Sequence, residues 1–142
     1  MKTAVHDFVG DQTYVELPGH RFAVTASFET AKAGDYDALC IPGGRAPEYL
    51  RLDRRVIELV QAFDKAGKPI AAICHGPQIL AAAGVLRGRH VTGYRTVAGE
   101  LQAAGAMYQD REVVVDDRLI TSRQPADLPA FMDAVLRMLK PS

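Results

Sequence analysis

The sequence predicts an α/β fold, a three-layer sandwich in which helices cover both faces of a mostly parallel, doubly wound sheet. Short apolar runs of strand length alternate along the chain with longer segments whose apolar residues recur at helical spacing, and this alternation is typical of such sheets. Two of the apolar runs, 36–41 and 70–73, end directly in turns rich in glycine and proline. Because sites in parallel sheets lie outside the carboxyl ends of the strands, we expect the functional site at these two turns.

Composition indicates one domain, residues 1–142. Hydrophobic residues make up 48% of the 142 residues, which is enough for a single core. The 17 basic and 17 acidic residues balance and are interspersed, which argues against a nucleic acid partner. The two cysteines, Cys40 and Cys74, provide neither a disulfide framework nor a metal-ligand spacing, so we expect a cytoplasmic protein without a metal. No signal peptide is visible, and glycine, proline and polar residues interrupt the uncharged stretch 70–86, so we expect no membrane segment.

Turn signals and periodicity predict the elements of the first half of the chain. The first thirty residues are expected to form strands joined by turns, at 3–5, 13–15 and 21–26. The run 36–41 is predicted to be a strand that stops at Pro42-Gly43-Gly44, with Cys40 as an inert core residue. In the helix that follows, Asp53 is placed to cap and Gly67 to terminate, and the apolar positions are Leu52, Val56, Leu59, Val60 and Phe63.

The stretch 68–80 predicts a strand, a sharp turn and a helix. The apolar run 70–73 stops at Cys74, the chain turns through His75-Gly76-Pro77, and an Ala/Leu-rich helix follows that Gly84 ends. Beyond it we expect a strand at 90–92, a helix that Gly105 stops, and a hairpin of 112–116 with 119–122. The final helix has an apolar stripe formed by Leu128, Phe131, Met132, Val135, Leu136 and Leu139.

Cys74 at this bend is a candidate nucleophile. A thiol there lies beside the free amides of a helix N-terminus, which favour the thiolate and can hold a developing oxyanion. The arrangement is that of a nucleophile elbow with cysteine in place of serine. Gly43 and Gly44 supply further backbone amides at the neighbouring strand end. The alternatives are that Cys74 is a small buried hydrophobe and that Gly43-Gly44 is only a turn.

Several blocks of this sequence resemble the signature blocks of the PfpI family of cysteine peptidases, which belongs to the wider DJ-1 and class I glutamine amidotransferase-like superfamily. The blocks are IPGGRAPEYL at 41–50, AICHGPQ at 72–78 and AGVLRG at 83–88, and the similarity continues through 113–116, 121–123 and 127–129. It covers essentially the whole chain from about Lys2. The resemblance implies a flavodoxin-like sandwich and an activity that needs no cofactor.

The resemblance also implies roles for single residues. Cys74 matches the family nucleophile, and His75 matches its adjacent histidine. Glu48 matches an acid that reaches the histidine of a neighbouring subunit, so a homo-oligomer, whether dimer, trimer or hexamer, is expected. Gly44 matches the loop glycine whose amide, with that of His75, lines the oxyanion site, and Tyr94 matches an aromatic residue beside the nucleophile. From the residues alone, Glu48 could equally be a solvated acid in a first helical turn, and Tyr94 a core residue.

This sequence matches the family from a point inside the family's pattern, and the first unit of that pattern has no counterpart here. Relatives begin with a strand, a helix and a second strand, and this chain starts after that unit. The unit supplies a glutamate whose protonated carboxyl hydrogen-bonds the nucleophile, and no glutamate of this sequence takes its place. It also pairs with the sheet and covers one of its faces. Without it, we expect the runs 39–41 and 70–73 to lie at a sheet edge with apolar side chains facing water.

Two functions remain open on this basis. The first, implied by the resemblance, is a cysteine-dependent stress-response enzyme in which Cys74 attacks a carbonyl group of a small compound, a peptide or a protein, as in peptidases, glyoxalases and protein deglycases. The second is a non-catalytic protein of the same fold, in which Cys74 is a redox sensor or the whole domain a holdase-like chaperone. Turnover that disappears in Cys74→Ala distinguishes the first from the second.

Overall fold

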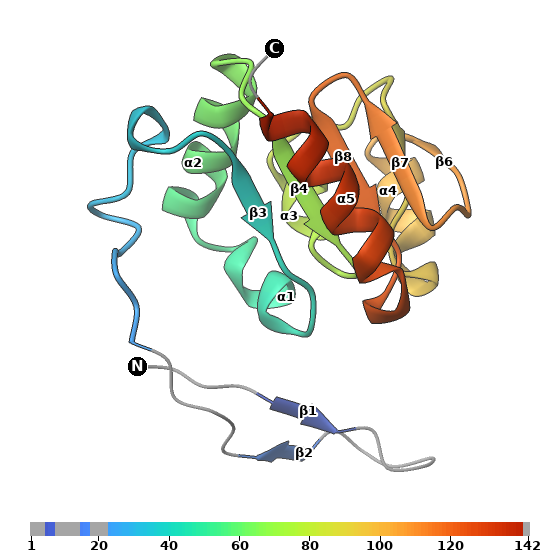
Figure 1. Ribbon diagram of the computed structural model, residues 1–142. Coiled ribbons are helices and arrows are strands. Elements are labelled where there is room, and N and C mark those ends of the chain that lie inside the picture. Colours follow the sequence, from blue (N-terminus) through green and yellow to red (C-terminus); the bar gives the residue numbers. More distant parts are fainter. Residues whose placement is uncertain (1–4, 8–14, 18–22, 141–142) are drawn as a thin grey trace.

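The computed structural model describes residues 5–7, 15–17 and 23–140 (Figure 1). Strand β1 (Val5–Asp7) pairs antiparallel with β2 (Val15–Leu17), so the first two predicted strands are present, each two residues further along than predicted. The prediction of a third strand is wrong for residues 23–26, and residues 21–22 lie outside the described ranges. Residues 23–26 are exposed, so their alternating pattern buries no apolar face, and burial of one face is what holds a strand in register.

The main sheet has the strand order β3-β4-β8-β7. Its first three strands run parallel, and the fourth is antiparallel, so the mostly parallel sheet is confirmed. The strands are β3 (Leu39–Ile41), β4 (Ile70–Ile73), β7 (Val113–Asp116) and β8 (Leu119–Ser122). A separate parallel pair consists of β5 (His90–Val91) and β6 (Met107–Tyr108).

Helices lie on both faces of this sheet, with α5 on one face and α3 on the other (Figure 1). The α-helices are α1 (Ala46–Leu50), α2 (Arg54–Lys65), α3 (Pro77–Ala82), α4 (Ala98–Ala103) and α5 (Leu128–Leu139). The described residues also form three short 3-10 helices, namely η1 (Ala33–Asp35) before β3, η2 (Arg95–Val97) before α4 and η3 (Pro125–Asp127) before α5. The three-layer sandwich predicted from the alternation of strands and helices is therefore confirmed.

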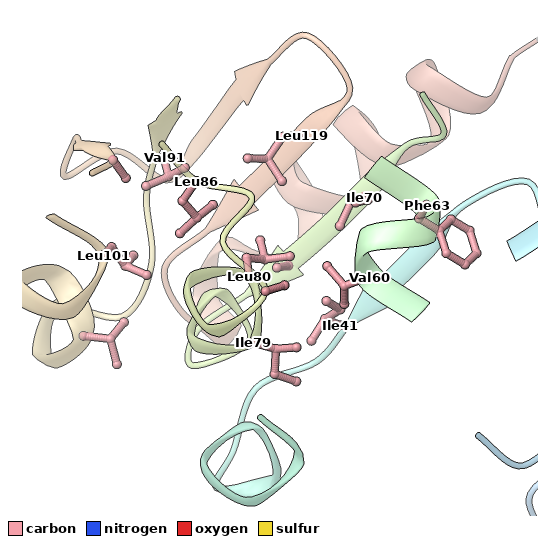
Figure 2. Packing of buried hydrophobic residues seen from close by; sticks show 14 of the residues in the cluster. Ile41, Val60, Phe63, Ile70, Ile79, Leu80, Leu86, Val91, Leu101 and Leu119 are labelled. Carbon is pink, nitrogen blue, oxygen red and sulfur yellow. The ribbon is translucent and has the colours of Figure 1, made fainter. Parts of the chain in front are cut away.

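Strand β4 divides its side chains between two apolar clusters because successive residues point to opposite faces. Ile70 and Ala72 belong to the larger cluster, with Val60, Ile79 and Leu80 of α2 and α3 (Figure 2). On the other face, Ala71 and Ile73 pack with three residues of the smaller cluster, namely Ile120, Phe131 and Val135.

The expectation that 70–73 lies at a sheet edge is wrong. Strand β4 pairs with β3 on one side and with β8 on the other, and all four of its residues are buried. Among the strands that the structure describes, β3 is the end strand of this sheet, as expected for 39–41. Cys40 pairs with Ala71 in the sheet and therefore lies on the same face, the one that α5 covers. Cys40 is exposed, so the prediction that it is a core residue is wrong. Helix α5 packs over β8 and β7, so the Cys40 position receives no such cover.

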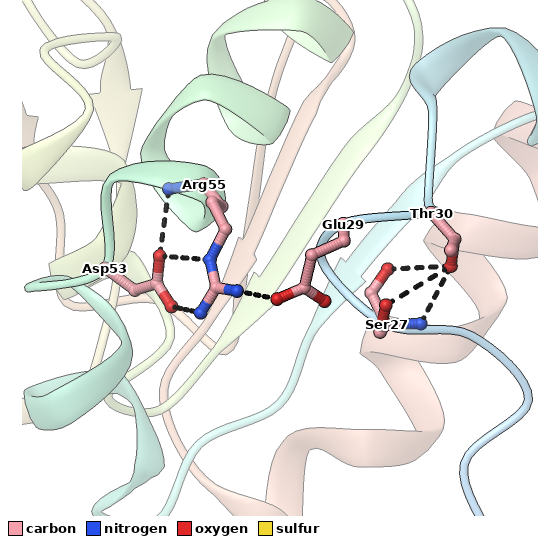
Figure 3. Close-up of polar contacts among 5 residues, drawn as sticks. All are labelled: Ser27, Glu29, Thr30, Asp53 and Arg55. Atoms are coloured by element: carbon pink, nitrogen blue, oxygen red, sulfur yellow. Dashed lines mark hydrogen bonds and ion pairs between the residues drawn. The ribbon is translucent and has the colours of Figure 1, made fainter.

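Helix α2 begins and ends where the sequence indicates. The Asp53 carboxylate accepts a hydrogen bond from the Arg55 backbone N–H at 2.9 Å, which caps the first turn, and Gly67 follows the helix with φ of +63°. The Arg55 guanidinium also pairs with Asp53 and with Glu29, so it connects the segment before β3 to this helix start (Figure 3). Leu52, predicted as part of the apolar stripe, precedes the helix and is 81% exposed.

The apolar stripe predicted for α5 is only partly buried. Phe131 and Val135 face the sheet and are buried. Four other residues of the stripe are 40% or more exposed, namely Leu128, Met132, Leu136 and Leu139. The predicted elements between α3 and α5 are confirmed, including the antiparallel pairing of β7 with β8. In the described ranges, every helix is too short or too polar to cross a bilayer.

Candidate functional site

The turn from β4 into α3 holds Cys74 in an unusual backbone conformation. Cys74 has φ of +64°, in the left-handed region that residues other than glycine rarely adopt. Its backbone is fixed on both sides, because its N–H donates to the Ser122 carbonyl at 2.9 Å and its carbonyl accepts from the Tyr94 N–H at 2.8 Å. Cys74 is therefore held in position by Ser122 at the end of β8 and by Tyr94 just before η2.

Gly43 lets the loop after β3 approach the thiol closely. A Cβ atom at Gly43 would lie 2.6 Å from Cys74 Cβ and 3.1 Å from Cys74 Sγ, so no side chain fits there. The turn after β4 also needs a glycine, because a Cβ atom at Gly76 would lie 2.6 Å from the carbonyl oxygen of Ile41, at the end of β3. Gly44 has φ of +74°, so it also makes the turn that the sequence predicted. The two turns at the ends of β3 and β4 thus form one site.

Three hydrogen-bonding groups surround the Cys74 sulfur. His75 Nδ1 lies 3.2 Å from Sγ, and the backbone amides of Gly44 and His75 both interact with the sulfur. An oxyanion that formed next to Sγ would lie near the same two amides, which are preorganised because they belong to the tight turns.

Burial raises the pKa of the Cys74 thiol above its ordinary value, and the hydrogen bonds from the Gly44 and His75 amides only partly oppose this effect. The expectation that the thiolate is favoured at rest is therefore wrong for this chain. The desolvation of the half-buried sulfur exceeds the effect of the two amide hydrogen bonds. Chemistry at Cys74 at neutral pH consequently needs a base that takes the thiol proton, and His75 is within reach.

Tyr94 lies beside His75. The two rings stack with their centroids 5.0 Å apart and their planes at 28°. Tyr94 also packs against the larger apolar cluster, so it is both a core residue and a wall that holds the imidazole. A Cβ atom at Gly93 would lie 3.1 Å from Leu101 Cδ1 and 3.4 Å from the Cys74 carbonyl oxygen, so Gly93 lets this segment pack tightly. The glycine before Tyr94 is the signal in the sequence that could have indicated this packing.

Glu48 is placed differently from the other four predicted residues. Cys74, His75, Gly44 and Tyr94 come together at the ends of β3 and β4, whereas Glu48 lies exposed in the first turn of α1. Its carboxylate pairs with Arg45 Nε of the same turn at 3.1 Å. Within the described ranges, no group of three His, Cys, Asp or Glu side chains is arranged to hold a metal ion.

Comparison with known proteins gives one consistent family. A sequence model of the DJ-1/PfpI family matches residues 2–138. The chain is 45% identical to Protein DJ-1 homolog D of Arabidopsis thaliana, over 96% of this chain but 36% of that protein. It is 44% identical to Deglycase PfpI of Pyrococcus furiosus, over 86% of this chain and 74% of the relative. Identity to Putative cysteine protease YraA of Bacillus subtilis is 45%, over 86% and 72% of the two chains.

Solved structures of the same family share the fold. The DJ-1 protein of Schizosaccharomyces pombe superposes with a TM-score of 0.73 at 30% identity, covering 91% of this chain and 68% of that one. A two-domain protein with DJ-1/ThiJ/PfpI-like and ferritin-like domains from Anabaena variabilis gives a TM-score of 0.78 at 43% identity. The match covers 79% of this chain and 33% of that one, so here, as with the Arabidopsis protein, the chain spans about a third of the length of its relative.

Proposed function

This chain belongs to the DJ-1/PfpI family, and on that premise we propose that it is an enzyme that attacks carbonyl groups with the thiol of Cys74. Relatives named as deglycases and as a putative cysteine protease support a reaction of this class. The substrate that we propose first is a small aldehyde such as methylglyoxal or its adduct on a protein, with peptides as the second candidate. Both would begin with the same addition to a carbonyl carbon.

The observation that carries this proposal is the set of contacts around the sulfur. His75 Nδ1, in the tautomer that leaves it unprotonated, lies 3.2 Å from Sγ and can take the thiol proton as the sulfur attacks. A bond then forms between sulfur and carbon, and the electron pair of the carbonyl π bond moves to its oxygen. The Gly44 and His75 amides would stabilise that oxyanion until His75 returns the proton to it, which completes the addition.

Glu48 has a separate place in the proposal. Its exposed position on α1 suits a carboxylate that orients the histidine of a neighbouring subunit, which is the role implied by the family resemblance. A carboxylate near the imidazole would favour the protonated form that appears after the thiol has lost its proton. The site would then be completed only in an oligomer.

The proposal is tested by turnover of methylglyoxal and of a fluorogenic peptide, with wild-type protein and two matched cysteine variants. We expect Cys74→Ser to reduce turnover to the uncatalysed background, whereas Cys40→Ser should retain wild-type rates because the exposed Cys40 lies on β3 away from the turn. Circular dichroism and thermal unfolding establish that both variants are folded.

Full turnover in folded Cys74→Ser would overturn the proposal. So would wild-type protein that turns over neither substrate while dilute peroxide selectively oxidises Cys74, because this result would indicate a redox sensor.

A further inference from the structure

One carboxylate joins the three helices that surround the site. Glu100 of α4 accepts a hydrogen bond from Arg51 Nη1 at 2.5 Å through one oxygen and from Gln78 Nε2 at 2.9 Å through the other. Arg51 is the residue that follows α1, and Gln78 is the second residue of α3. Nothing in the sequence pattern indicated this connection, because the three residues are far apart in the chain.

Both partners of Glu100 are themselves fixed. The Arg51 N–H donates to the Pro47 carbonyl at 3.0 Å, and Arg51 Nε donates to the Glu48 carbonyl at 3.3 Å, so its side chain is tied to α1. Gln78 is 8% exposed, and its Oε1 has no hydrogen-bond partner among the described residues. The bond from Gln78 Nε2 to Glu100 therefore satisfies the donor side of this buried amide group alone.

The connection leads directly to the catalytic turn. The Gln78 backbone N–H donates to the His75 carbonyl at 3.0 Å, so the residue that holds Glu100 also holds His75. The ring of His75 stacks on Tyr94, which immediately precedes η2, and η2 leads into α4. A shift of α3 against α4 would therefore move the imidazole relative to both the Tyr94 ring and the Cys74 sulfur.

We propose that Glu100 is a positioning residue for the reaction at Cys74: by holding Arg51 and Gln78 together, it fixes α3 against α1 and α4 so that His75 keeps its contact with the sulfur. This inference rests on the proposed function. In this role Glu100 acts on the site through Gln78. The alternative is that the Arg51–Glu100 pair only stabilises the fold.

The test compares Glu100→Ala with Asp64→Ala, which removes a matched ion pair. The Arg89–Asp64 pair has both side chains 30% exposed, and the Arg51–Glu100 pair has 30% and 36%. Asp64 lies at the end of α2 that is next to the start of β4, whereas Cys74 follows the end of that strand. Any effect of losing a half-buried ion pair on stability should therefore be similar in the two variants.

We expect Glu100→Ala to lower kcat for methylglyoxal roughly 10- to 100-fold with little change in KM, because displacement of a reacting group by about 1 Å has effects of this size. Asp64→Ala should keep the wild-type kcat. Glu100→Gln should recover most of the activity. The side-chain oxygen of the new glutamine can accept from Arg51, and its NH2 group can donate to Gln78 Oε1 once the Gln78 amide has rotated by about half a turn.

A second measurement does not depend on turnover. The pH midpoint for alkylation of Cys74 by iodoacetamide should rise in Glu100→Ala, because a displaced His75 amide would no longer lower the pKa of the thiol, and it should be unchanged in Asp64→Ala. If wild-type protein proves inactive, this midpoint still tests the positioning role. If Glu100→Ala does not fold, Gln78→Met tests the same contact.

Wild-type kcat and an unchanged alkylation midpoint in folded Glu100→Ala, or in Gln78→Met in its place, would overturn the inference and leave Glu100 as a structural residue. An equal loss of kcat in Asp64→Ala would overturn it as well, since the effect would then follow stability alone.

Discussion

At the scale of single residues, the chemistry of Cys74 depends on contacts that are remote in sequence. The strand, the turn and the Cys-His pair could be predicted from residues 68–80 because these signals are local. The raised pKa of the thiol could not, because it results from burial, and the residues packed against Cys74 include Gly43, which is remote in the sequence. The hydrogen bond between Glu100 and Gln78 could not be predicted either, because the two residues are also far apart in the sequence.

The raised pKa predicts how Cys74 reacts with pH. We expect the rate of its alkylation by iodoacetamide in native protein to increase with pH through a midpoint above the value of about 8.5 that is ordinary for cysteine. Timed labelling followed by peptide mass spectrometry measures this midpoint, and the same peptide in urea-denatured protein is the control.

The same shift makes stability depend on pH. Because the folded state favours the protonated thiol, its contribution to the free energy of unfolding is present below the pKa of the unfolded chain and is lost as pH rises through the folded pKa. Cys74→Ala should lack this part of the decline. A native midpoint below that of denatured protein would show that the thiolate is favoured after all.

At the scale of elements, helix ends were predicted more accurately than strand ends. Asp53 and Gly67 mark the ends of α2 through their own backbone preferences. Strand β3, in contrast, is limited to the three residues that pair with β4, although the apolar run in the sequence begins at 36. In α5, the spacing identified six apolar positions, but only Phe131 and Val135 pack in the core of the sheet and are buried.

The cap of α2 allows a test of one such local signal. Asp53→Ala should lower the free energy of unfolding by about 1 kcal/mol, because the Arg55 N–H loses its acceptor. Asp53→Asn should lose much less, since asparagine caps equally well and the ion pair with the half-exposed Arg55 contributes little. Urea unfolding measures both variants.

Glu58→Ala, which removes the exposed Arg54–Glu58 pair of the same helix, is the control and should change the free energy of unfolding by less than about 0.5 kcal/mol. Equal losses in Asp53→Asn and Asp53→Ala would show that the charge, and not the cap, is what matters.

At the scale of the whole molecule, one side of the sandwich presents apolar surface to water. Within the described residues, the sheet ends at β3, whose Cys40 is exposed. On the same face, α5 exposes Leu128, Met132, Leu136 and Leu139. The sequence predicted apolar surface at a sheet edge for 39–41 and 70–73, but 70–73 is buried, and in 39–41 only Cys40 is exposed. Burying such a side chain contributes roughly 1.5 to 3 kcal/mol, and the stability of a whole domain is only about 5 to 15 kcal/mol.

We therefore expect this 142-residue chain to be an obligate oligomer or prone to aggregation, with a Tm that rises with protein concentration. Sedimentation and thermal unfolding over a wide concentration range measure this. Leu136→Lys should weaken association because it places a charge in the exposed α5 surface. A compact monomer whose unfolding is independent of concentration would contradict the expectation.

Association can also be measured through the site. If Glu48 serves the histidine of a neighbouring subunit, a mixture of inactive Cys74→Ala and inactive Glu48→Gln should regain part of the activity. Each protein alone should remain inactive at every concentration. Mixtures without activity would place Glu48 outside a shared site.

The left-handed backbone conformation of Cys74 sets thermostability against chemistry at this position. Glycine is the residue that adopts φ near +64° without steric cost, and another residue there costs roughly 1 to 2 kcal/mol. Glycine has no thiol. At this position the side chain that folding prefers and the side chain that chemistry needs are therefore different, and selection for thermostability alone would favour an inert protein.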